Sequence, residues 1–293
     1  MPVRIVQSPQ NARLKELRRA LAAAPRACSG EGAGPAVLAG IEGPNLLAEA
    51  LRAGLGIACV FVAQGAEHLL DSVALPPHTE VLLLPGKLLA LALTTESPQP
   101  IAALVELPSW SWSALLGGCS APLLLVLAGL QDPGNVGAVL RSAEAFGVSG
   151  VLSLPGTVSA WNPKAVRASA GSVFRVPLLA TSTEECFPRL RAAGIRIVAT
   201  SARNASLAPL VDLAAPTALL IGNEGNGLPP ELAAQADAAV TIPCPGPVES
   251  LNAAVAAAIL LYEASRQRLA PQPLQGSSGP DSAPRIQPFR SAR

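Results

Sequence analysis

Three clusters of glycine, amide and charged residues in the second half of the sequence have the residue types of a ligand-binding or catalytic site. The first lies between 130 and 144, where an apolar run leads into a Pro-Gly turn and a helical pattern that includes Asn135, Gly137 and Arg141. Gly137 and Arg141 share one helix face, so a small residue beside a guanidinium would leave room for another group to approach closely. A helix start with a solvated arginine is the alternative.

The second cluster is the hexapeptide Gly-Asn-Glu-Gly-Asn-Gly from Gly222 to Gly227, which follows a predicted strand. Its glycine spacing differs from the G-x-G-x-x-G of dinucleotide-binding proteins and from the phosphate-binding loop of nucleoside triphosphatases. The cluster alone therefore predicts only that backbone groups are open to a ligand or to another segment.

The third cluster runs from Ile242 to Ala258. Three prolines and a glycine stiffen a loop that ends in Ser250-Leu251-Asn252, and an alanine-rich helix follows. We predict Ser250 as the N-cap of that helix, because serine is a favoured residue there. Taken alone, this segment is also typical of an ordinary buried helix.

The cysteine and histidine content argues against a metal site. The five cysteines are scattered without a C-x-x-C pair, and the only histidines are His68 and His78. This pattern speaks against a zinc site, a disulfide framework and histidine-based catalysis, and it fits a reducing compartment. We expect no metal and a cytoplasmic location.

The composition is that of a folded, water-soluble protein. Of 293 residues, 50% are hydrophobic and 14% are charged, with a formal net charge of +1. The apolar content excludes a disordered chain, and no apolar stretch approaches the roughly 20 residues of a membrane span. No secretory leader pattern opens the chain. The balanced charge provides no global field that would attract nucleic acid.

Apolar periodicity predicts an α/β protein with two domains, at 1–107 and 122–268, joined by a linker at 108–121. A tail at 269–293, rich in proline, serine and glycine, is expected to be disordered. In the first domain we expect helices at 11–24 and 44–53 and strands at 36–41, 57–62, 80–84 and 101–107. In the second we expect strands at 122–130, 150–154, 195–200, 217–222 and 238–242, a helix ending at 146 and a last helix at 250–268. The continuous apolar run at 122–130 is typical of a buried parallel sheet.

Two features of the first 121 residues leave alternatives open. The first 26 residues hold six basic residues and one acid, and the cationic face of the helix at 11–24 is either solvated or an arm that contacts phosphates. Trp110 and Trp112 in the linker could stack on bases, but the packing of such a pair against a domain is more common.

Together and in this order, the three clusters resemble the SpoU/TrmH family of RNA ribose 2′-O-methyltransferases, within the SPOUT superfamily. Asn135, Gly137 and Arg141 match the family's Asn-x-Gly-x-x-x-Arg segment, and 222–227 matches its Gly-Asn-Glu-Gly-x-Gly. Residues 242–258 match an Ile-Pro loop followed by Ser-Leu-Asn and an alanine-rich helix. Between them, 162–171 is similar to the family's Lys-x-x-Arg-Ala-Ser-x-Gly segment. Cys244 stands where methionine is common, and Ala253-Ala254 replaces a frequent Val-Ser.

The resemblance implies a fold, a cofactor and partners. The second domain would be a SPOUT domain with a parallel sheet and a deep trefoil knot, a rare chain topology, preceded by a small α/β RNA substrate-binding domain. The cofactor would be S-adenosylmethionine, held at Thr200, Gly222, Ile242 and Leu251. The domain would form a homodimer.

The resemblance also implies the roles of side chains. Arg141 would be the catalytic residue. Because a guanidinium has a pKa above about 12, we expect it to stay charged, grip the phosphate beside the target ribose and stabilise the developing alkoxide, rather than act as a base. Asn135 would orient Arg141 or the ribose, Glu224 would brace the knot through backbone amides, and Ser250 and Asn252 would cap the last helix and touch RNA. The expected phosphate contacts are Lys164, Arg167, Arg13, Lys15 and Arg18.

The RNA substrate cannot be read from these motifs. The separate N-terminal domain favours ribosomal RNA by analogy, and 2′-O-methylation of tRNA is the alternative. An RNA-binding module that has lost catalysis is disfavoured by the intact Asn135, Arg141, Glu224 and Asn252. A nicotinamide-dependent oxidoreductase is disfavoured by the glycine spacing of 222–227.

Overall fold

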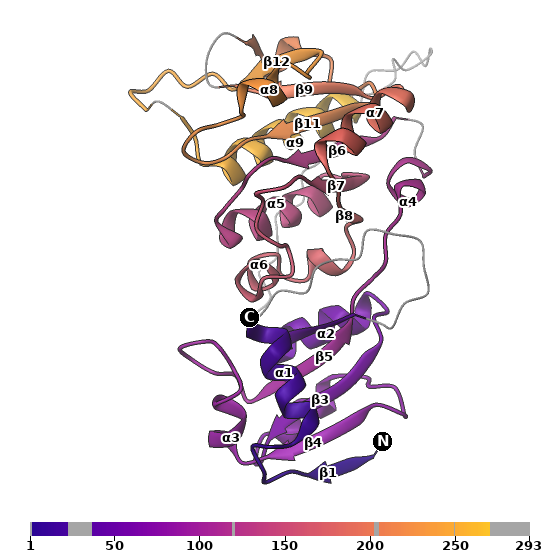
Figure 1. Cartoon of the computed structure of the whole chain (residues 1–293), viewed down its shortest axis with the longest axis vertical. Coiled ribbons are helices and arrows are strands. Elements are labelled where there is room, and N and C mark those ends of the chain that lie inside the picture. Colours follow the sequence, from indigo (N-terminus) through magenta and orange to yellow (C-terminus); the bar gives the residue numbers. More distant parts are fainter. Residues whose placement is uncertain (1, 23–36, 119–120, 202–204, 249, 270–293) are drawn as a thin grey trace, which may run out of the picture.

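The computed structural model describes residues 2–22, 37–118, 121–201, 205–248 and 250–269. It shows two α/β units, each with its own sheet, arranged one above the other along the long axis (Figure 1). The expected disordered tail lies outside the described residues except for Leu269.

The N-terminal unit is a five-stranded mixed sheet in the order β1-β4-β3-β5-β2. Strands β1, β4 and β3 are parallel, and β5 runs antiparallel to both β3 and β2. Its elements are β1 (Val3–Ile5), α1 (Ala12–Ala22), β2 (Leu38–Glu42), α2 (Pro44–Arg52), β3 (Ile57–Ala63), a 3₁₀ turn η1 (Glu67–Ser72), β4 (Glu80–Leu84), α3 (Gly86–Ala90) and β5 (Ile101–Glu106).

Helix α1 packs its leucine stripe on this sheet. Leu14, Leu17 and Leu21 are buried, as the 3.6-residue period predicts. Gly40 on β2 lies directly beneath Leu21, and a Cβ atom at Gly40 would come within 2.7 Å of the Leu21 Cγ atom. The glycine therefore allows the helix to approach the strand closely, and Lys15, Arg18 and Arg19 are left exposed on the outer face of α1.

The C-terminal unit is an entirely parallel sheet of seven strands in the order β10-β12-β9-β11-β6-β7-β8. Its strands are β6 (Leu123–Leu127), β7 (Gly150–Ser153), β8 (Leu178–Ala180), β9 (Arg196–Thr200), β10 (Ser206–Leu207), β11 (Thr217–Ile221) and β12 (Ala238–Thr241). Its helices are α5 (Pro133–Ala145), α6 (Pro163–Ala168), α7 (Thr183–Ala192), α8 (Pro230–Ala233) and α9 (Ala253–Arg268), with 3₁₀ turns η2 (Ser172–Phe174) and η3 (Ala208–Leu210). Every residue of β6 and β11 is buried, as expected for strands covered on both faces.

The segment between the two sheets is anchored rather than free. A short helix α4 (Trp112–Leu116) buries Leu115. The Trp112 indole N–H donates to Glu185 on α7 at 3.1 Å, and the Arg189 guanidinium lies over the Trp112 ring, 5.2 Å from its centroid. Trp110 is partly buried against two hydrophobic clusters, one that extends through both units and one that belongs to α4 and the C-terminal unit. The prediction that this pair packs is therefore confirmed.

Several elements differ from the sequence expectation. The strand expected at 122–130 is shorter, because the chain turns at Gly129 with a φ of 76°. The last helix begins at Ala253 with Asn252, not Ser250, as its N-cap. Short elements that the periodicity did not reveal include β1, β8, α6 and α7.

The two units are joined by an ion-pair cluster centred on Arg175, which follows η2. Its guanidinium donates to Glu49 on α2 at 2.7 Å and, through two nitrogens, to Glu144 on α5. The hydrogen bonds from Arg175 hold the pKa of Glu144 below its ordinary value of 4.5, against an opposing effect of burial. Gly171, with a φ of 90°, lies against the Glu49 side chain, where a Cβ atom would come within 2.6 Å.

Replacing Arg175 with alanine should lower the free energy of unfolding by about 1–2 kcal/mol at pH 7, because a partly buried multidentate pair is stronger than an exposed one. Because the folded pKa of Glu144 is lowered, its contribution is present above the unfolded pKa and is lost as pH falls through the folded pKa. The difference between wild type and variant in urea unfolding should therefore shrink in acid.

Arg52→Ala is the matched control, since Arg52 pairs with the same Glu49 carboxylate from an exposed position. It should cost less than about 0.5 kcal/mol. Equal losses for the two variants would contradict a special role for Arg175.

Candidate active site

The three clusters of the sequence become three neighbouring loops. They follow β6, β11 and β12, and the strands of this sheet are all parallel, so the loops lie at its carboxyl edge. Ligands of open parallel sheets bind at this edge. The first cluster continues into α5, and the third leads into α9, which packs against α5.

Asn135, in the first turn of α5, connects these loops with one buried carboxamide. Its Nδ2 atom donates to Glu224 Oε1 at 2.8 Å, and its Oδ1 atom accepts from Asn252 Nδ2 at 3.0 Å. Asn135 is 9% exposed, so both ends of its amide need partners. The three side chains form one polar chain across the three loops.

Glu224 binds backbone as well as side chain. The amides of Gln131 and Asp132 each donate to its carboxylate at 3.4 Å. Burial alone would raise the pKa of Glu224, but the hydrogen bonds from Asn135 and these amides outweigh it, and the pKa is lowered. Glu224 is therefore an ionised brace between the loops after β11 and β6.

The loop after β11 is further ordered by Asn223, which the sequence analysis did not single out. Its Nδ2 atom donates to the Gly129 carbonyl at 2.8 Å, and its Oδ1 atom accepts from the amides of Gly225 and Asn226. This is an Asx turn, in which an asparagine oxygen accepts from the backbone amide two residues on, here that of Gly225. A Cβ atom at Gly222 would lie 2.4 Å from the Gly227 carbonyl carbon, so the glycine closes the loop on itself.

Asn252 caps the last helix, as the resemblance implied, and also contacts Asn135, which was not predicted. Its Oδ1 atom accepts from the amides of Ala254 and Val255 and so caps α9, while its Nδ2 atom reaches Asn135. Ser250 is exposed, and its hydroxyl has no hydrogen-bond partner among the described residues. The prediction of Ser250 as the N-cap is therefore wrong, because the helix starts two residues later.

Arg141 lies on α5 beyond Asn135 and is exposed. Within the described part of the chain its guanidinium has no hydrogen-bond or ion-pair partner. The prediction that Gly137 leaves room for another group to approach closely is confirmed. Helix α6 fills that room, since a Cβ atom at Gly137 would lie 2.4 Å from the Ala165 carbonyl oxygen and 2.5 Å from the Ala168 Cβ atom.

The expected cofactor residues lie at the same edge. Thr200 ends β9 and donates from its hydroxyl to the Leu220 carbonyl at 2.8 Å, while Ile242 and Leu251 are half-buried at the two ends of the loop after β12. In the described residues of 243–251, no backbone group makes a hydrogen bond to another backbone group. Its polar backbone is thus open to a ligand.

The expected phosphate contacts divide into paired and unpaired groups. Lys164 pairs with Asp132 at 2.9 Å, and Arg13 pairs with Glu16 and Glu80. Arg167, Lys15 and Arg18 are exposed without a partner among the residues that the structure describes. Over those same residues, no cluster of potential metal ligands and no helix long and apolar enough to cross a membrane is found.

Comparison with known proteins defines the class. Residues 122–262 match the model of the SpoU rRNA Methylase family. The chain is 32% identical over 226 residues to the 23S rRNA (guanosine(2553)-2′-O)-methyltransferase RlmP of Bacillus subtilis, covering 76% of this chain and 86% of that protein.

Two solved structures are also similar. The AdoMet complex of the SpoU methyltransferase AviRb from Streptomyces viridochromogenes is 29% identical with a TM-score of 0.73, covering 90% of this chain and all of that one (100%). An AdoMet-bound rRNA methyltransferase from Sinorhizobium meliloti is 29% identical with a TM-score of 0.74, covering 92% and 99%. These matches and the α/β fold with its parallel sheet define an RNA methyltransferase. The chain belongs to the SpoU rRNA methylase family.

Replacing Asn252 with alanine should lower the free energy of unfolding by about 1–3 kcal/mol, because α9 loses its cap and the buried Oδ1 atom of Asn135 loses its donor. Urea unfolding followed by circular dichroism measures this. Ser250→Ala is the control and should change stability by less than about 0.5 kcal/mol. A larger loss for Ser250→Ala than for Asn252→Ala would contradict the assigned cap.

Proposed function

We propose that the protein transfers a methyl group from S-adenosylmethionine to a ribose 2′-hydroxyl of ribosomal RNA. The observation that carries the proposal is the polar chain Glu224–Asn135–Asn252, which ties the three loops together at the start of α5. The same helix presents Arg141, which is exposed and has no partner among the described residues. Membership of the SpoU rRNA methylase family and the similarity to RlmP support the ribosomal substrate. The scattered cysteines favour action in the cytoplasm.

The cofactor fits the loops after β9, β11 and β12. We assign it to Thr200, Gly222, Ile242 and Leu251, where the open backbone of 243–251 offers hydrogen bonds and the half-buried Ile242 and Leu251 offer apolar contact. S-adenosylmethionine supplies a methyl group already activated on a sulfonium.

Arg141 then acts by charge and position. Its guanidinium binds the phosphate beside the target ribose, holds the 2′-oxygen in line and stabilises the alkoxide as the proton leaves to phosphate or water. Positioning alone can lower a barrier by roughly 7–11 kcal/mol. Asn135 and Glu224 act as positioning residues, since their hydrogen bonds fix the start of α5 from which Arg141 projects.

We further assign a trefoil knot to the C-terminal unit. Strand β12 lies beyond β9, two strands away from β11, yet α9 returns to pack on α5. The chain after β12 must therefore cross back past the loops that follow β9 and β11. The contact between Asn252 and Asn135 supports a path through these loops.

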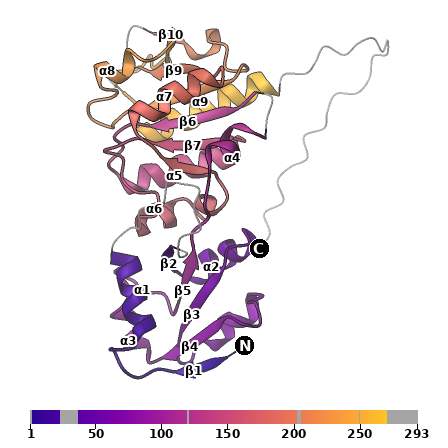
Figure 2. The same ribbon diagram turned by 45° about the vertical axis from the view of Figure 1, so that its right-hand side comes forward.

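The RNA would extend over both units. Lys15, Arg18 and Arg19 form an exposed basic face on α1, and Arg167 lies on α6, which is beside the N-terminal unit in Figures 1 and 2. A cation that has no ion-pair partner does not have to break an ion pair when it contacts phosphate. Arg13 and Lys164 contribute less, since each is already paired.

A second copy of the chain would cover the outer face of α9. Val255, Ile259 and Tyr262 are exposed at helical spacing, by 48%, 38% and 59%, and Tyr262 meets Phe146 edge-to-face at 6.1 Å. An exposed apolar stripe marks an interaction surface, and it continues the packing of α9 on α5. We propose a homodimer through this face.

Ile259→Asp should convert the dimer to a monomer, because a carboxylate cannot be buried unpaired at the interface. Light scattering with size exclusion measures the mass. Leu91→Asp is the matched control at an exposed leucine of the N-terminal unit, and it should stay dimeric. A monomeric wild type would refute the proposed dimer.

Arg141→Lys should lower kcat for methyl transfer to 23S rRNA by at least about 100-fold, with unchanged S-adenosylmethionine binding. Arg52→Lys is the control and should be fully active.

The pH–rate profile of Arg141→Lys separates two roles for Arg141. An unchanged profile supports a phosphate clamp, whereas an acidic limb that moves with the lysine pKa would show that the residue acts as a base. If the wild-type protein methylates tRNA but not ribosomal RNA, the proposed substrate is wrong and tRNA takes its place. If it methylates no RNA, the proposed function is refuted.

A further inference from the structure

The N-terminal unit contains a hollow of about 460 Å³ between β1, the loop after it and the first turn of α1. Its polar lining includes Arg4, Gln7, Ser8, Asn11, Arg13 and Glu80. We call it the β1–α1 pocket. Both views place β1 and the start of α1 at the end of this unit that points away from the C-terminal unit (Figures 1 and 2).

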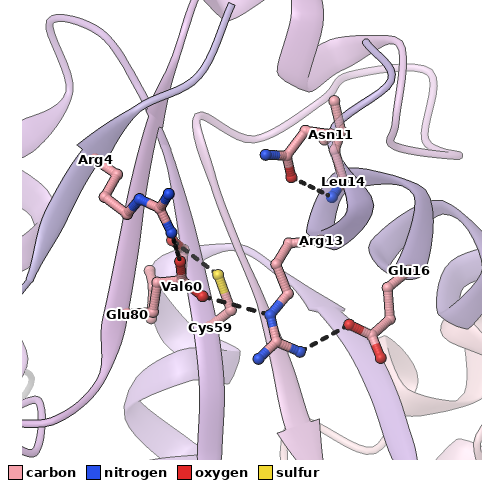
Figure 3. Close-up of polar contacts among 8 residues, drawn as sticks. All are labelled: Arg4, Asn11, Arg13, Leu14, Glu16, Cys59, Val60 and Glu80. Atoms are coloured by element: carbon pink, nitrogen blue, oxygen red, sulfur yellow. Dashed lines mark hydrogen bonds and ion pairs between the residues drawn. The ribbon is translucent and has the colours of Figure 1, made fainter. Parts of the chain in front are cut away.

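Two guanidiniums converge on one carboxylate in this pocket. Arg4 reaches Glu80 at 3.3 Å and Arg13 reaches it at 3.4 Å, from β1 and α1 on either side (Figure 3). Charge-assisted hydrogen bonds are typically 2.7–2.9 Å, and the bond of Arg13 to Glu16 meets this value at 2.9 Å. The two contacts of Glu80 are therefore loose, and its oxygens can accept closer donors.

The other polar residues that line the pocket, Gln7, Ser8 and Asn11, carry no charge. Cys59, the neighbour of Glu80 across β3 and β4, is buried. Burial, and then the negative charge of Glu80, raise the pKa of the Cys59 thiol to about 12, so it stays neutral. Arg13 keeps Glu16 as a partner when Glu80 turns to a ligand. The ligand thus meets one carboxylate and the donors of two guanidiniums.

This set of groups fits a base rather than a phosphate. The Glu80 carboxylate repels phosphate, but it can accept two hydrogen bonds from one edge of a guanine, from N1–H and from the amino group. The guanidiniums donate to the guanine acceptors, a pairing that is common in nucleic-acid recognition, and a guanidinium plane can also stack on an unpaired base. Uracil has no amino group to offer the carboxylate.

We propose, building on the proposed RNA methyltransferase function, that the β1–α1 pocket binds an unpaired guanine of the RNA substrate at a distance from the methylated nucleotide. Glu80 reads its Watson–Crick edge, and Arg4 and Arg13 hold its acceptor side. The pocket selects the substrate, and it takes no part in the transfer itself.

The test uses the full-length protein and fluorescein-labelled RNA nonamers of uridine with G, A, C or U in the centre, with affinity measured by anisotropy at fixed salt. Wild type should bind the G nonamer about 10-fold more tightly than the others. Glu80→Gln should reduce that preference to near 1 while leaving the affinity for the U nonamer unchanged. Glu16→Gln is the matched control, since it also removes a partner of Arg13, and it should keep the preference.

Methyl transfer to 23S rRNA by the same variants separates the two proposals. Glu80→Gln should raise KM for the RNA with kcat and cofactor binding unchanged. Wild type that selects G without methylating RNA would refute only the function. The proposed guanine site would be refuted if the wild-type protein methylates RNA but shows no preference for G, prefers another base or binds no nonamer. An equal loss of the G preference in Glu16→Gln would also refute it.

Discussion

The carboxamide of Asn135 is the constraint on which the site depends. It satisfies both neighbours at once, because its Nδ2 atom donates to Glu224 and its Oδ1 atom accepts from the Asn252 amide. An aspartate there would place a second carboxylate against Glu224, and an apolar residue would leave two buried polar groups without partners. The carboxamide of Asn135 therefore fixes the relative positions of three loops that follow three different strands.

Basic residues divide into those with structural partners and those without. Arg175 joins the two units, and Lys164 joins α6 to the start of α5 through Asp132. Arg141, Arg167 and Arg18 have no such partners among the described residues and are exposed. Since the chain has a net charge of only +1, attraction of RNA depends on where these unpaired cations gather and not on a global field.

Much of the fold could be predicted from apolar runs. The strand at 80–84 was predicted with its observed bounds, and 217–222 ends one residue late. Strand β8 and helix α6 were missed because each is too short to show a period. Helix α7 was missed because Pro188 and its polar residues mask its pattern.

The residues of the site could be predicted from the sequence, but their arrangement in space could not. Asn135, Glu224 and Asn252 were singled out one by one, but no spacing rule brings them into contact, because their loops meet only through the order of the strands. Ser250 was chosen as cap because serine and asparagine have similar preferences at that position. Gly137 was expected to allow a close approach, but the approaching element, α6, could not be named, because a helix of six residues is too short to show a period.

The strand order also has a consequence for synthesis on the ribosome. Strand β6 is translated first in its unit, yet its inner neighbour β11 emerges much later, and the Asn252 that completes the polar chain later still. A nascent chain shorter than about the start of α9 holds Asn135 and Glu224 without their third partner. The enzyme can therefore complete its site only after Asn252 has left the exit tunnel, well after β6, α5 and β11 have emerged.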